Sequence, residues 1–69
     1  MAVIDDVEAL IFRRPGLSEV AISEEIFGKG ARQQQVNPSC RQLSRQGRVE
    51  RRGRGGNGDP FTYYPAGKD

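Results

Sequence analysis

Arginine is the residue type in this sequence best suited to chemistry, and it is concentrated in one stretch. Residues 29–54 contain a single acid, Glu50, and eight cations: Lys29, Arg32, Arg41, Arg45, Arg48, Arg51, Arg52 and Arg54. Seven of the eight are arginine, whose planar guanidinium can bond to a phosphate or to the edge of guanine through two parallel N–H groups. This charge pattern is typical of a protein that binds a polyanion. The alternative is a basic face that contacts only solvent.

The sequence lacks most of the side chains on which catalysis and metal binding depend. It contains no histidine and one cysteine, Cys40. The commonest general base is therefore absent, and a cysteine metal cage or a disulfide cannot form within one chain. The adjacent carboxylates Asp5-Asp6 and Glu24-Glu25 would point about 100° apart on a helix, so they do not converge on a substrate. We expect no enzyme activity, no cofactor and no metal site.

Three helices must position the arginines, and the first two lie in the acidic part of the chain. Apolar residues recur at helical spacing over 2–14, which predicts a first helix that Pro15-Gly16 ends. Ser18 is a suitable N-cap for a second helix over 18–27. The residues that define the two apolar faces are Val3, Val7, Leu10, Ile11, Ile22 and Ile26.

The third helix is predicted over 32–46, because Val36, Cys40 and Leu43 recur at helical spacing and Gly47 follows them. Pro38 leaves its start open. Asn37 could cap a helix that begins at Pro38, or the helix could begin near Arg32 and be kinked at the proline. Cys40 lies on the apolar stripe and is expected in the core; a redox-sensing thiol would instead have to be exposed.

The last part of the chain predicts a β-hairpin over 48–64, with 65–69 as a tail. Val49 lies in its first strand, the run from Phe61 to Tyr64 forms its second strand, and turn residues separate the two. One of Tyr63 and Tyr64 should be buried and the other exposed. The expected fold is α+β in a single domain over 1–69. Its predicted core comprises Val7, Leu10, Ile11, Ile22, Ile26, Val36, Cys40, Leu43 and Val49, with Phe12, Phe27 and Phe61.

Two segments resemble a known family pattern. The stretch AISEEIFG at 21–28 is similar to EIAxxLxG, and VNPSCRQLSRQGRVER at 36–51 is similar to VxxxCRxLxxxGxVxR. Both patterns occur in the winged helix-turn-helix domains of bacterial transcription regulators, and the hairpin resembles their wing. The resemblance covers nearly the whole chain, with 65–69 outside it. Pro38 departs from the pattern, because that position lies within regular helix in the family.

The resemblance implies a small winged helix, a three-helix helix-turn-helix core followed by a two-stranded wing, that binds double-stranded DNA in transcription regulation. Its recognition helix would lie in the major groove. Polar residues on the outer side of that helix are the expected base contacts: Gln34, Asn37 and Arg41. Cations of the wing and of the recognition helix and its approach are the expected backbone contacts: Lys29, Arg32, Arg45, Arg51, Arg52 and Arg54. Glycines of the wing would let backbone amides approach phosphate.

Other partners are compatible with the same sequence. A protein-interaction module, or a homodimer, would use the acidic face of the first helix at Asp5, Asp6 and Glu8, because fold alone does not decide function. A structured RNA could bind the same basic stretch. No apolar run approaches the roughly 20 residues that span a bilayer, and the acidic N-terminus does not resemble a signal peptide. We therefore expect no membrane partner and a cytoplasmic, nucleoid-associated location.

Overall fold

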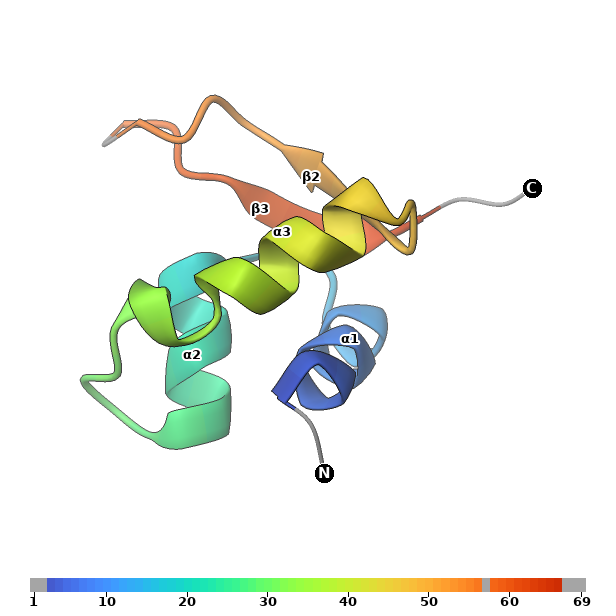
Figure 1. Cartoon of the computed structure of the whole chain (residues 1–69). Helices are drawn as coiled ribbons and strands as arrows, with labels where there is room; N and C mark the ends of the chain where they lie inside the picture. Colours follow the sequence, from blue (N-terminus) through green and yellow to red (C-terminus); the bar gives the residue numbers. More distant parts are fainter. Residues whose placement is uncertain (1–2, 57, 67–69) are drawn as a thin grey trace.

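Three α-helices and a three-stranded antiparallel sheet make up the residues that the structure, a computed structural model, describes: 3–56 and 58–66 (Figure 1). The elements in chain order are α1 (Val3–Arg13), β1 (Leu17–Ser18), α2 (Glu19–Phe27), a 3-10 turn η1 (Gln33–Gln35), α3 (Asn37–Arg45), β2 (Val49–Arg52) and β3 (Thr62–Pro65). The sheet lies on one side of α3, and α1 and α2 lie on the other (Figure 1). The α+β class expected from the sequence is therefore observed.

The first two helices lie close to their predicted bounds. α1 buries Val7, Leu10 and Ile11 on one face, as the spacing predicts. Ser18 caps α2, since its Oγ accepts a hydrogen bond from the Ala21 backbone N–H at 3.2 Å. This bond satisfies one of the amides that an α-helix leaves unpaired at its start.

The sheet has one strand more than the sequence predicted. Its order is β1-β3-β2, so β3 is central, with Leu17 opposite Tyr63 and Arg51 also opposite Tyr63 on the other side. The predicted hairpin is observed as β2 and β3, but β1 was missed because it contains only two residues and is too short to show an alternating pattern. β1 joins the start of α2 to the hairpin.

The third helix is shorter than the predicted 32–46. α3 begins at Asn37 with Pro38 in its first turn, and Gln33–Gln35 form the separate 3-10 turn η1. An α-helix running through Pro38 would lose a hydrogen bond and bring the ring against the carbonyl four residues earlier. The predicted helix start near Arg32 is therefore wrong. The start at the proline is close, although Val36 takes the N-cap position and no side chain caps the helix.

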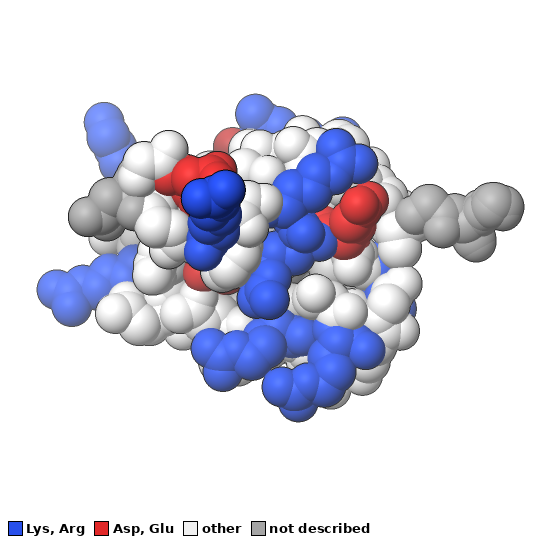
Figure 2. Space-filling model, turned by 90° about the horizontal axis from the view of Figure 1, so that it is seen from above, with Lys and Arg blue, Asp and Glu red and all other residues white. Residues whose placement is uncertain are grey.

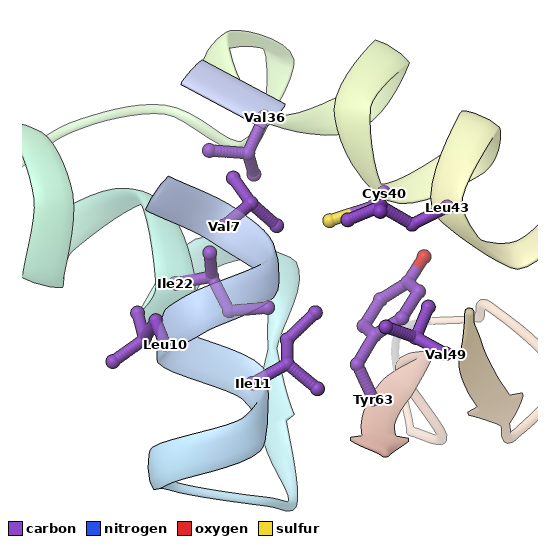
Figure 3. Packing of buried hydrophobic residues seen from close by; sticks show 9 residues of the cluster. All are labelled: Val7, Leu10, Ile11, Ile22, Val36, Cys40, Leu43, Val49 and Tyr63. Carbon is purple, nitrogen blue, oxygen red and sulfur yellow. The ribbon is translucent and has the colours of Figure 1, made fainter. Parts of the chain in front are cut away.

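The core lies where α1, α2, α3 and the sheet meet (Figure 3). Eight of the apolar residues predicted from helix and strand spacing are buried there, and Tyr63 is the additional member. Ile26 and Phe61 are partly buried against this cluster. Phe12 and Phe27 were wrongly expected inside, and their exposed fractions are 51% and 44%. Phe12 follows Ile11 by about 100° around α1, so it turns away from the stripe that packs.

Candidate nucleic-acid interface

A groove of about 450 Å³ runs between the first turn of α2, the start of α3 and the β2–β3 hairpin. We call it the hairpin groove. The side chains that give it its chemical character are Glu19, Gln33, Asn37, Arg41, Arg51 and Phe61. A shallower hollow adjoins it, lined by Arg41, Ser44, Arg45 and Arg51. Arg41 and Arg51 line both, so the two hollows form one continuous surface.

Three arginines border this surface and are called here the arginine cluster: Arg41, Arg45 and Arg51. All three are exposed. Across residues 3–56 and 58–66, none of them has a carboxylate oxygen within 4.0 Å. In Figure 2 basic side chains form a broad band on the face seen from above, with few acidic ones beside them. Close positive charges without acidic partners repel one another, so they favour an anion on this face.

Other basic residues are already paired with acids. Arg14 lies 2.6 Å from Glu25, and Arg48 forms an ion pair with Glu8 that joins α1 to the start of the hairpin. These pairs reduce the local field on the α1 side of the molecule. The arginine cluster, by contrast, brings three cations without such a pair onto one surface.

The two neighbouring arginines of β2 point to opposite faces of the hairpin, as successive residues of a strand do. Arg51 lies on the face of buried Val49 and lines the hairpin groove, with its guanidinium carbon 4.2 Å from the centre of the Phe61 ring. Arg52 lies on the outer face, 4.2 Å from the centre of the Tyr64 ring. It also forms an ion pair with Glu50 at 3.4 Å. Of these two predicted backbone contacts, only Arg51 therefore shares a surface with α3.

The glycines of the hairpin loop have a steric role. A Cβ on Gly55 would lie 2.5 Å from the Phe61 ring, and Gly55 has a φ of +84° that side-chain-bearing residues rarely adopt. A Cβ on Gly53 would lie 2.6 Å from the Pro60 carbonyl oxygen. The Gly55 amide donates to the Asp59 carbonyl at 2.9 Å, so it is not free to approach a phosphate.

Only some of the remaining predicted contacts line the groove. Asn37 and Arg41 line the groove. Gln34 is exposed on η1 and does not line the groove, whereas its neighbour Gln33 does. Lys29 is exposed in the loop after α2, at the end of that helix remote from the hairpin (Figure 1). Arg32 is exposed where this loop approaches η1, and its carbonyl accepts from the Ser23 hydroxyl at 2.7 Å. Arg54 is exposed in the hairpin loop.

No protein-family model matches this chain, and no curated protein or solved structure matches it. Its function must therefore be inferred from its own surface. Within residues 3–56 and 58–66, no helix has the length and apolar character needed to cross a membrane. In the same residues, no three His, Cys, Asp or Glu side chains gather in a way that could hold a metal ion.

A buried tyrosine fixes the one acidic side chain among the groove residues. The Tyr63 hydroxyl donates to Glu19 Oε2 at 2.5 Å. Burial, and then this hydrogen bond, raise the pKa of Tyr63 above its usual range, so the hydroxyl remains a donor. Burial, followed by the Glu19 charge, raises the pKa of the Cys40 thiol to about 12. Cys40 is therefore a protonated core residue, as its position on the apolar stripe predicted.

Sequence reasoning did not identify Glu19 or Gln33 as groove residues. Glu19 had the appearance of an ordinary acid in the first turn of a helix, where it interacts favourably with the helix dipole. Gln33 was placed on a continuous helical wheel, but residues of a 3-10 turn advance by about 120° each rather than 100°. Pro38, in the first turn of α3, was the only signal in the sequence that the regular helix does not extend back to Gln33.

Proposed function

We propose that the chain is a double-stranded DNA-binding module of winged-helix type that acts in transcription regulation in the cytoplasm. α3 would be the recognition helix and the β2–β3 hairpin the wing. The observation that carries the proposal is the arginine cluster, in which α3 and β2 together present three cations without acidic partners. The proposed activity is binding, without catalysis.

The dimensions of α3 support this mode of binding. An α-helix with its side chains is about 10–12 Å across, so α3, with nine residues, fits the major groove of B-DNA, which is about 12 Å wide. Pro38, Arg41, Gln42 and Arg45 line the outer surface of α3. In the proposed complex Asn37 and Arg41 contact base edges, while Arg45 and Arg51 contact phosphates. Gln34, Lys29 and Arg32 would reach only flanking DNA.

A salt titration tests the proposal directly. If Arg32, Arg45, Arg51 and Arg54 each neutralise a phosphate, the logarithm of the affinity for random duplex DNA should fall with the logarithm of salt concentration with a slope of about −3.6. Arg45→Ala with Arg51→Ala should bring that slope close to −1.8, because two contacts are lost. The matched control is Arg14→Ala, which removes a cation paired with Glu25 and should leave the slope unchanged. No binding at low salt would refute the proposal.

A protein contact through α1 is the second candidate function, and exposed Phe12 favours it. This aromatic ring shares the helix with the acidic residues Asp5 and Asp6, so the surface combines an apolar side chain with negative charge. Glu8, the third acid expected there, is paired with Arg48. Sedimentation equilibrium distinguishes a homodimer formed through α1 from a monomer. Phe12→Ser should dissociate such a dimer without changing the affinity for DNA.

A further inference from the structure

The hairpin groove contains hydrogen-bond acceptors beside its arginines. Glu19 lines the same groove as Arg41 and Arg51, and Asn37 contributes a buried Oδ1 that has no hydrogen-bond partner. A surface that contacted only phosphates would need donors, because phosphate oxygens accept. A carboxylate there would repel the backbone. The acceptors therefore indicate that this groove faces a different part of the DNA.

Glu19 is held firmly by its surroundings. It is the first residue of α2, directly after the Ser18 cap. Its Oε2 accepts from Tyr63, which is fully buried on the central strand. Among the described residues Glu19 forms no ion pair, and its Oε1 accepts no hydrogen bond. One oxygen thus anchors the carboxylate while the other remains free to accept.

Duplex DNA offers few donors to such an oxygen. Phosphates and deoxyribose within the strand provide none, and in the major groove the only donors are the exocyclic amines N6 of adenine and N4 of cytosine. Guanine presents O6 and N7 there, and thymine presents O4. All three are acceptors and repel a carboxylate.

We propose that Glu19 is a specificity-determining residue that accepts a hydrogen bond from the exocyclic amine of cytosine or adenine. Tyr63 is its positioning residue. The inference rests on the proposed DNA-binding function and adds one base position to it. Glu19 excludes guanine and thymine at that position, whereas the arginine cluster supplies attraction that is independent of sequence.

Selection from a random duplex library, followed by affinity measurements on the selected site, tests this assignment. The unaltered protein should prefer cytosine or adenine over guanine and thymine at one position by about tenfold or more. Glu19→Ala should abolish that preference and bind random duplex more tightly at low salt, because a negative charge leaves the groove. Glu24→Ala is the matched control. It removes the same charge from the exposed side of α2, outside the groove, and should keep the preference.

Two conservative variants distinguish a role in base recognition from a role in folding. Glu19→Gln keeps the side chain's shape but adds an N–H donor, so guanine or thymine should become acceptable at the position. Tyr63→Phe keeps the buried ring and removes only the hydroxyl that fixes Glu19. It should weaken the preference several-fold, while circular dichroism shows that the helices are retained. A merely structural role for Tyr63 would leave the base preference unchanged.

The outcomes that overturn the inference are distinct from those that overturn the proposed function. If Glu19→Ala selects the same bases, or weakens binding to all duplexes equally, Glu19 is only part of the helix start. If the protein prefers duplex RNA and Glu19→Ala removes that preference, the acceptor contacts a ribose 2′-hydroxyl and not a base. If no duplex binds, the proposed function fails and this inference fails with it.

Discussion

The neighbouring residues Arg51 and Arg52 offer a sharp test of which hairpin face meets DNA. They differ by one position but lie on opposite faces. Arg51 shares the hairpin groove with α3, and Arg52 is paired with Glu50 on the outer face. Each guanidinium stacks at 4.2 Å on an aromatic ring, so replacing either by alanine removes a similar stacking interaction of about 0.5–1 kcal/mol. The two variants therefore lose a similar stacking interaction, and they should differ in binding.

The expected magnitude follows from counterion release. One phosphate contact contributes about 0.9 to the salt slope. Its contribution to the affinity is therefore about eightfold larger at 0.1 M salt than at 1 M. Arg51→Ala should therefore weaken binding to random duplex about eightfold at 0.1 M and reduce the slope by about 0.9. Arg52→Ala should weaken binding less than about twofold, because a screened, acid-paired cation on the far face contributes little.

Fluorescence anisotropy of a labelled duplex, titrated with each variant at several salt concentrations, measures both quantities. Arg51→Lys is the control that keeps the charge and should retain most of the salt slope. Equal losses for the two alanine variants would show that the hairpin contributes only general positive charge. A larger loss for Arg52→Ala would mean that the outer face meets DNA, and the proposed placement of α3 and the wing would be wrong.

Four further predictions concern the core and the groove. Leu43→Ala should lower the free energy of unfolding by about 2–5 kcal/mol in urea titrations, because Leu43 is fully buried; a loss below about 1 kcal/mol would contradict this packing. Gly55→Ala should lower the melting temperature, since its Cβ would meet the Phe61 ring at 2.5 Å; an unchanged melting temperature would contradict the loop geometry. Arg41→Ala should relax base preference at one position of a selected site, whereas uniform weakening would make Arg41 a phosphate contact. Burial raises the pKa of Cys40 from 9.0 to about 12, so the folded chain keeps a proton that the unfolded chain releases. The Cys40 contribution to stability should therefore be complete below pH 9 and decrease between pH 9 and 12, which urea titrations across that range measure. In the same protein the thiol should react with a disulfide reagent near pH 8 only after unfolding.

Spacing within single elements predicted much of the core. Val7, Leu10 and Ile11 are buried because residues three and four apart share one face of a helix. The same rule placed Cys40 and Leu43 inside. It could not place Phe12 or Phe27, because whether a flanking aromatic is covered depends on whether another element lies beside it.

The candidate site was only partly predictable. The sequence identified a basic stretch and named Arg41, Arg45 and Arg51 among many cations. It could not separate these three from Lys29 or Arg52, because each of these residues is a cation in the same stretch. Whether a cation belongs to the arginine cluster depends on the alternation of side chains along β2, on the length of α3 and on which acids lie near that cation.

What the sequence by itself determined is therefore local: the α+β class, the apolar faces of the helices, and the division of charge along the chain. Tertiary structure alone decided the third strand, the burial of Tyr63 and the hairpin groove with Glu19 in it. The physical reason is distance along the chain. Tyr63 and Glu19 are 44 positions apart, and no local periodicity links them. Their hydrogen bond exists only because β1 pairs with β3 and brings the start of α2 against the hairpin.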